Sequence, residues 1–175
     1  MSRPFLHRLR SAVAALALVA AAAVPASAAG PDLIFEKSTV WHMLTPDAKL
    51  AVYGIDDPAV EGVACHYTLP LQGGVKGMFG VAEEVSDISL ACRQIGPVRF
   101  KEKFAQGDEV FSQRRSLVFK RMQIVRGCDA ARNVLVYLVY SDRPIEGSPK
   151  NSTSTVPIMP WGGEAPARCE DFLKR

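Results

Sequence analysis

The sequence lacks the short motifs by which several common protein classes are recognised. It contains no Cys-x-x-Cys pair, so a zinc site built on closely spaced cysteines is not expected. Gly-x-Ser-x-Gly and Gly-x-x-x-x-Gly-Lys-Ser/Thr are both absent, which argues against a hydrolase nucleophile elbow and a nucleotide phosphate loop. The composition of the 175 residues is not that of a disordered tail, a coiled coil or a multi-pass membrane protein. What remains is a single globular domain.

Residues 1–28 have the pattern of a secretory signal peptide. A basic start with three arginines precedes an apolar run from Ala12 to Val24, and a small-residue cleavage site ends at Ala28. The apolar run, about thirteen residues, is too short to cross ~30 Å of hydrocarbon as a helix. We therefore predict export from the cytoplasm, with cleavage after Ala28 or one residue later.

The charge of the chain argues against nucleic acid as a partner. The sequence has 21 Lys plus Arg against 18 Asp plus Glu, and three of the basic residues lie in the predicted leader. The processed chain therefore carries equal numbers of basic and acidic residues. Nucleic-acid binding depends on a basic excess that neutralises phosphates, so we expect no nucleic-acid partner.

All four cysteines follow the predicted leader, and an even number in an oxidising compartment predicts two disulfides. Four cysteines allow three pairings. The alternation of apolar and polar residues places Cys65 and Cys92 on the inner faces of two expected strands, where they can meet. Cys128 lies beside an expected turn and Cys169 lies in the C-terminal tail, residues 162–175. We predict the pairs Cys65–Cys92 and Cys128–Cys169.

Runs of β-forming residues predict a mainly antiparallel structure. Residues 45–48 and 127–132 are expected to close two hairpins, Gly96-Pro97 to end a strand, and residues 75–84 to form a short helix. Residues 141–163, rich in Pro, Gly, Ser and Asn, are expected to wrap the outside. The predicted fold is a single mainly β domain, a sandwich or barrel with one or two short helices, stapled by disulfides. The expected strands are residues 38–44, 49–55, 62–69, 87–95, 109–113, 117–126 and 133–140.

Residues with catalytic or metal-binding chemistry are few, and each has an ordinary structural interpretation. After the leader only His42 and His66 remain, both in expected strands where a surface or satisfied histidine is the usual case. Carboxylates in turns could bind calcium, although their spacing matches no known calcium loop. A closely placed pair could instead serve a glycoside hydrolase. The carboxylates considered are Asp56, Asp57, Glu61, Glu83, Glu84 and Asp87.

A basic strip and a glycine-rich segment are the remaining candidates for binding. The basic residues would line one side of a sheet and hold an anion, although a solvated, salt-bridged face is the commoner outcome. Gly73, Gly74, Gly77 and Gly80, together with Lys76, predict a close-packed loop that needs positive φ, or a contact for a ligand or partner. The basic residues are Arg114, Arg115, Lys120, Arg121 and Arg126.

Taken together, several segments resemble the CreA family of bacterial exported proteins. The resemblance runs from about residue 38 to residue 161, most of the chain after the leader. The segments that carry it are Asp56–Pro58, Gly62–Cys65, Gly73–Gly77, Gly80–Glu83, Ser89–Pro97, Ser116–Lys120, Glu146–Ser152 and Val156–Trp161.

The resemblance implies a periplasmic protein of a Gram-negative bacterium and implies little about activity. It also implies that cysteines matching Cys65 and Cys92 recur in the family, whereas Cys128 and Cys169 do not. Structural bridges of this kind are consistent with the absence of thiol catalysis.

We predict a non-enzymatic binding or envelope-associated domain, with no cofactor and no membrane span once the leader is removed. Its partner is expected to be a periplasmic protein or a small ligand. An envelope hydrolase using Glu83, Glu84 or Asp87 and a purely structural stress-related protein remain alternatives. Loops carry function more often than cores do, and the expected contact surface is Asp56, Asp57, Gly73, Gly74, Lys76, Gly77, Ser148, Lys150 and Asn151.

Overall fold

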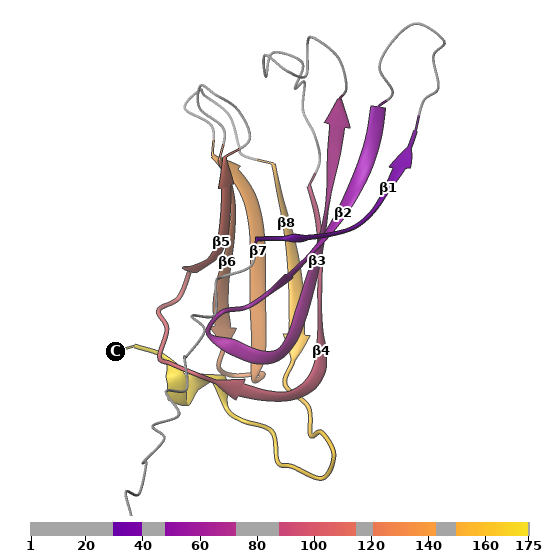
Figure 1. Cartoon of the computed structure of the whole chain (residues 1–175). Helices are drawn as coiled ribbons and strands as arrows, with labels where there is room; N and C mark the ends of the chain where they lie inside the picture. Colours follow the sequence, from indigo (N-terminus) through magenta and orange to yellow (C-terminus); the bar gives the residue numbers. More distant parts are fainter. Residues whose placement is uncertain (1–29, 40–47, 73–87, 115–120, 143–149, 175) are drawn as a thin grey trace, which may run out of the picture.

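The computed structural model describes residues 30–39, 48–72, 88–114, 121–142 and 150–174, which form two four-stranded antiparallel sheets (Figure 1). Within each sheet the strands are adjacent in chain order. This arrangement confirms the predicted mainly β fold, and the described residues include one short 3-10 helix, η1 (Cys169–Phe172). The first sheet contains β1 (Asp32–Ser38), β2 (Ala48–Asp56), β3 (Val60–Gln72) and β4 (Ser89–Phe100). The second contains β5 (Asp108–Arg114), β6 (Arg121–Asp129), β7 (Val134–Asp142) and β8 (Asn151–Pro157).

The hydrophobic core lies between the two sheets. Alternate residues of β7, namely Leu135, Tyr137 and Val139, are fully buried because side chains two apart in a strand share one face. Contact between the sheets includes Tyr67 of β3 and Phe111 of β5, whose ring centroids lie 5.9 Å apart. The core therefore has the two-layer arrangement of a sandwich.

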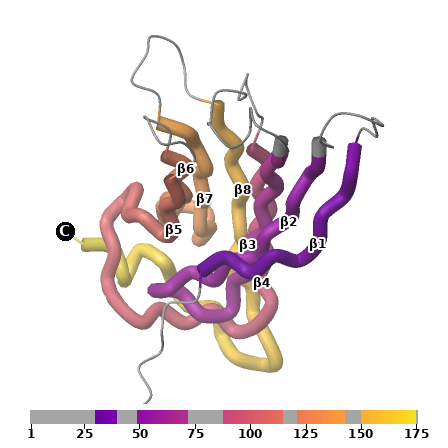
Figure 2. The backbone as a smooth tube through the Cα atoms, turned by 45° about the horizontal axis from the view of Figure 1, so that its top comes forward, coloured from indigo at the N-terminus to yellow at the C-terminus, as the bar shows by residue number. Residues whose placement is uncertain are grey.

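The strands give the molecule two distinct ends (Figures 1 and 2). We call one the tail end: it carries the connections at residues 57–59, 101–107 and 130–133 together with η1. We call the other the loop end. It is formed by the strand termini Ser38, Ala48, Gln72, Ser89, Arg114, Arg121, Asp142 and Asn151.

Side-chain hydrogen bonds close the seam where β4 lies beside β8. The Cys92 backbone N–H donates to the Ser154 hydroxyl over 2.8 Å. Gln94 receives a hydrogen bond from the Met159 N–H and donates to the Met159 carbonyl, at 2.9 and 3.0 Å. These contacts satisfy backbone groups at the edges of both sheets without a backbone ladder between them.

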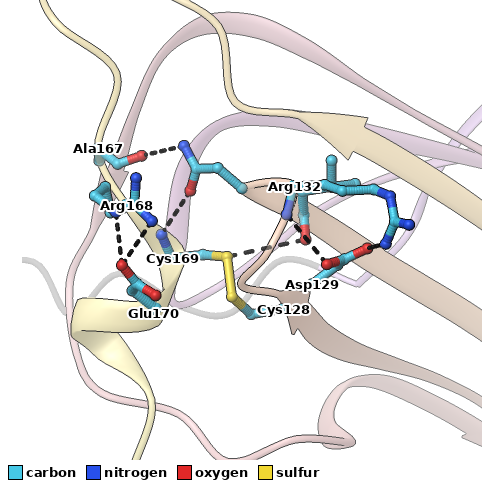
Figure 3. Close-up of polar contacts among 9 residues, drawn as sticks. Cys128, Asp129, Arg132, Ala167, Arg168, Cys169 and Glu170 are labelled. Atoms are coloured by element: carbon cyan, nitrogen blue, oxygen red, sulfur yellow. Dashed lines mark hydrogen bonds and ion pairs between the residues drawn. A yellow bond between two sulfur atoms is a disulfide. The ribbon is translucent and has the colours of Figure 1, made fainter.

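Both disulfides pair as the sequence predicts, and all four cysteines are buried. Cys65 and Cys92 lie directly opposite each other on β3 and β4. Cys128, near the end of β6, joins Cys169 at the start of η1 (Figure 3). Asn133 supports this second connection, because its side chain accepts from the Cys169 N–H and donates to the Ala167 carbonyl, each over 2.9 Å.

The prediction that Gly96-Pro97 ends a strand is wrong, because β4 continues to Phe100. Opposite this point, β3 contains a register shift between Glu61 and Val63. A Cβ atom on Gly62, whose φ is +79°, would lie 2.3 Å from the Pro97 carbonyl oxygen. Glycine at this bulge lets β3 approach the proline closely, and the ladder then resumes toward Phe100.

The prediction that residues 141–163 only wrap the outside is also wrong, because they contain β8. β8 has weak hydrophobicity because Ser152 and Ser154 take inward positions beside Val156, opposite β7. The strand predicted at residues 49–55 forms as β2 and pairs with β1, Asp32–Ser38. Most of the strand predicted at residues 38–44 lies outside the described residues. Most of the predicted turn at 45–48 and the whole predicted helix at 75–84 lie outside the described residues.

Candidate functional site

A buried ion pair joins the two sheets at the tail end. The carboxylate of Asp57 binds the Arg126 guanidinium, and the two side chains are 0% and 3% exposed. The Tyr137 hydroxyl donates to the second Asp57 oxygen over 2.9 Å. The Arg126 guanidinium also lies 4.4 Å from the centre of the Phe104 ring, within the range of a cation–π contact. We call Asp57, Arg126, Tyr137 and Phe104 the ionic cluster.

A turn positions Asp57, and strand register positions Arg126 and Tyr137. Asp57 directly follows β2, and its side chain accepts a hydrogen bond from the Ala59 N–H over 2.9 Å, as aspartates before a turn commonly do. Pro58 lies between them and fits this turn, because proline has no backbone N–H that would need a hydrogen-bond acceptor. Arg126 and Tyr137 are registered opposite each other on β6 and β7 with both side chains facing inward. The turn after β2 is thereby tied to the second sheet.

The ionic cluster brings opposite charges and a hydrogen-bond donor together in the core. Burial, and then the negative charge of Asp57, raise the pKa of Tyr137 well above its ordinary value, so the hydroxyl stays protonated and donating. The positive charge of Arg126 balances that of Asp57. The Arg126 Nε lacks a hydrogen-bond partner among the described residues. The buried Asp57 carboxylate thus contacts the Arg126 guanidinium, the Tyr137 hydroxyl and the Ala59 N–H.

The described members of the predicted contact surface lie at two different ends of the molecule. Asp57 is buried and exposed Asp56 lies beside it at the tail end, whereas Lys150 and Asn151 lie at the loop end. Burial of Asp57 follows from its pairing with Arg126, which the sequence does not reveal. The other members of that surface lie outside the described residues: Gly73, Gly74, Lys76, Gly77 and Ser148.

The predicted basic strip is likewise divided. Arg126 is not part of a surface strip, because it occupies an inward position of β6 and is buried in the core. Arg114 and Arg121 are exposed and registered opposite each other at the loop end. Arg115 and Lys120 lie outside the described residues, as do His42, Glu83, Glu84 and Asp87.

His66 and Glu61, the remaining candidates for catalysis or calcium binding, are exposed on β3. The His66 ring lies on the outer face of the first sheet, 3.8 Å from where a Cβ on Gly54 would be. Glu61 forms an exposed ion pair with Lys101. Within the described ranges, no group of three or more His, Cys, Asp or Glu side chains could hold a metal ion.

Polar side chains face inward between the sheets at the loop end. Gln113 of β5, Met122 of β6 and Ser141 of β7 are registered side by side, and Met122 belongs to the core. Ser152 of β8 faces the same way, opposite Val139. The Gln113 Oε1 is buried and has no hydrogen-bond partner among the described residues. A buried unpaired acceptor costs about 1–3 kcal/mol, so this group is suited to accept a hydrogen bond from outside the described part of the chain.

The outer face of the second sheet continues this polar character at the same end. The Tyr140 hydroxyl donates to Gln123 Oε1 over 2.8 Å, and the Gln123 amide donates to Asp142. Partial burial and then the charge of Asp142 raise the pKa of Tyr140. We call the inward and outward groups together the polar loop end: Gln113, Gln123, Tyr140, Ser141, Asp142 and Ser152.

Sequence reasoning missed Tyr137, Phe104 and Gln113. Tyr137 carried a signal, because an inward-facing tyrosine between Leu135 and Val139 needs a partner for its hydroxyl. Phe104 and Gln113 carried none, since their roles depend on pairing between strands far apart in the sequence.

Comparison with known proteins gives a consistent result. The family model described as CreA protein matches residues 34–161, which contain both sheets except Asp32 and Leu33 at the start of β1. Three relatives from different strains of Escherichia coli, each described as Protein CreA, are 50% identical over 127 residues. The match covers 70% of this chain and 81% of each relative. The family match ends before Cys169, and no solved structure matches the chain.

Proposed function

Because the chain belongs to the CreA family, we propose that it is an exported periplasmic domain that binds a protein or a small ligand and has no catalytic activity. Export is supported by the leader pattern of residues 1–28 and by two disulfides, which form and persist in oxidising compartments. No helix among the described residues is long and apolar enough to cross a membrane.

The observation that carries the binding role is the polar loop end. Gln113 presents a buried acceptor that has no partner among the described residues. Ser141 and Ser152, on β7 and β8, face inward at the same end of the second sheet. Binding sites commonly combine an apolar surface with a few polar groups that fix the orientation of the ligand. Met122, registered opposite Gln113, is the neighbouring apolar side chain and is fully buried in the core.

Export is tested by fractionating cells and measuring the intact mass of the protein. We expect the periplasmic fraction to contain a chain that begins at Ala29 or Gly30, with both disulfides formed. A full-length chain that remains in the cytoplasm, or free thiols in the exported protein, would contradict the proposal.

Binding is tested by placing a photoreactive amino acid at Asn151, at the loop end of β8. The matched control is Thr155, which is exposed on the same outer face of the same strand. After irradiation of whole cells, we expect a defined added mass at Asn151 and none at Thr155, whether the partner is a protein or a small molecule. Gln113→Leu should reduce the amount of the Asn151 adduct several-fold. The same adduct at Asn151 and Thr155, or no adduct at either position, would favour a purely structural role.

A further inference from the structure

Strand β1 is the element that the rest of the described chain leaves most exposed. All seven of its residues are exposed. Leu33, Ile34 and Phe35 are large and apolar, yet each is more than half exposed. β1 pairs with β2 on one side and forms the outer edge of the first sheet (Figures 1 and 2). The free side of an edge strand offers backbone N–H and C=O groups to another strand.

β1 carries exposed apolar side chains on both of its faces, and an exposed apolar edge strand tends to pair with another strand. Leu33 is opposite Tyr53, which stacks on the core residue Tyr67, so Leu33 lies on the inner side. Ile34 lies on the outer side, because its Cδ1 is 3.3 Å from the Cβ position of Gly54. A register shift between Leu33 and Phe35 places Phe35 on the outer side as well.

The charges of β1 are complementary to those of a second, antiparallel β1. Glu36 already forms an ion pair with Lys49. Asp32 and Lys37, near opposite ends of the strand, form no ion pair within the described ranges. An antiparallel arrangement brings the Asp32 end of each copy beside the Lys37 end of the other, twice by symmetry. A parallel arrangement would bring like charges together.

We propose that two copies of this chain associate through β1, antiparallel across a two-fold axis. The first sheets of the two copies then form one continuous sheet, and the free edge of each is paired. Ile34 and Phe35 of both copies meet on the outer face, where Leu50 of β2 adds exposed apolar surface. The seam between β4 and β8 is not part of this interface, because Ser154 and Gln94 already accept hydrogen bonds from backbone N–H groups there.

The test is sedimentation velocity of the exported, oxidised protein from low micromolar to hundred-micromolar concentration. We expect a concentration-dependent dimer, and we expect Phe35→Lys to remain monomeric throughout. The matched control is Ile95→Lys, which changes an equally exposed apolar residue on β4 and should leave the dimer unchanged. Thermal melting of each variant checks that it folds.

Charge exchange tests the antiparallel orientation. Asp32→Lys and Lys37→Asp should each raise the dimer Kd about tenfold, since each places like charges together at two symmetric positions. The double variant should return the Kd to that of the unmodified chain. The proposal is overturned if the unmodified protein is monomeric at every concentration, or if Ile95→Lys abolishes the dimer as Phe35→Lys does. It is also overturned if the double variant keeps the weaker dimer Kd of the single variants.

Discussion

At the scale of single residues, the ionic cluster illustrates the cost of placing a charge in a protein core. Asp57 and Arg126 both lose their hydration between the sheets, and their mutual attraction alone seldom offsets that loss. The Ala59 N–H and the Tyr137 hydroxyl add hydrogen bonds to the same carboxylate. The cluster therefore stabilises the fold only when it is complete. Removal of one member leaves the others buried without the contacts that offset their loss of hydration.

Asp57→Ala is expected to lower the free energy of unfolding by about 3–5 kcal/mol, because it leaves the buried Arg126 without a counter-ion. Urea denaturation of the oxidised protein measures this change. Asp56→Ala is the matched control, since Asp56 is the exposed neighbour, and its effect should stay within about 0.5 kcal/mol. Equal effects of the two substitutions would contradict a stabilising role for the ionic cluster.

Tyr137→Phe is expected to change how stability depends on alkaline pH. The folded chain raises the pKa of Tyr137, whereas an unfolded tyrosine loses its proton near pH 10. Unfolding therefore releases this proton above about pH 10, and stability falls as the pH rises. Tyr137→Phe should be less stable by about 1–3 kcal/mol at neutral pH, because Asp57 loses a donor, and should decline less steeply above pH 10.

Urea denaturation at a series of alkaline pH values checks the prediction for Tyr137. Tyr53→Phe serves as the control, because it removes a hydroxyl that is not part of the ionic cluster. If Tyr137→Phe and the unmodified chain lost stability in parallel above pH 10, the raised pKa of Tyr137 would not contribute to alkaline unfolding.

At the scale of elements, the sequence predicts strands best where apolar residues alternate with polar ones. β3 was expected for this reason, whereas β7 was expected because residues 134–140 form a continuous run of apolar side chains, and β7 lies between β6 and β8. β8 was missed because Ser152 and Ser154 occupy its inward positions. A buried serine is intelligible only when its partner is known, and the partner of Ser154 is the backbone of β4, far away in the sequence.

Gln94→Met is expected to weaken the seam between β4 and β8. It removes the three hydrogen bonds that the Gln94 side chain makes with Gly96 and Met159 while keeping a similar side-chain length. We expect stability to fall by about 1–3 kcal/mol and the Met159 amide to exchange its hydrogen faster. The control is Arg93→Met, the neighbouring exposed position on β4, which should leave Met159 exchange unchanged.

At the scale of the whole molecule, composition, cysteine count and the runs of β-forming residues were enough to predict one disulfide-stapled, mainly β domain. They could not predict which residues share an end of the molecule. Asp57 and Asn151 were predicted to share one surface because both lie in expected loops within the family resemblance, yet they lie at opposite ends of the strands. Such placement depends on strand order and register, and therefore on contacts between residues that no local pattern connects.

The two disulfides are expected to stabilise different parts of the molecule. Their sequence separations of 27 and 41 residues correspond to about 4 kcal/mol each on the loop-entropy model. Cys65–Cys92 joins two strands of one sheet, so its replacement by a pair of alanines should destabilise the whole domain and leave the tail attached. Cys128–Cys169 holds η1, where Phe172 stacks on Phe100 at 4.5 Å, against the tail end.

Replacing Cys128 and Cys169 by alanine should therefore release the tail before the sheets unfold. Trypsin digestion measures this, because Arg168 directly precedes η1 and is already exposed. We expect cleavage after Arg168 to become at least tenfold faster in this variant under native conditions, and to change little when Cys65 and Cys92 are replaced. Because the family match ends at residue 161, the domain is expected to stay folded after this cleavage. Loss of the sheet signal in circular dichroism upon cleavage would show instead that the tail is an integral part of the fold.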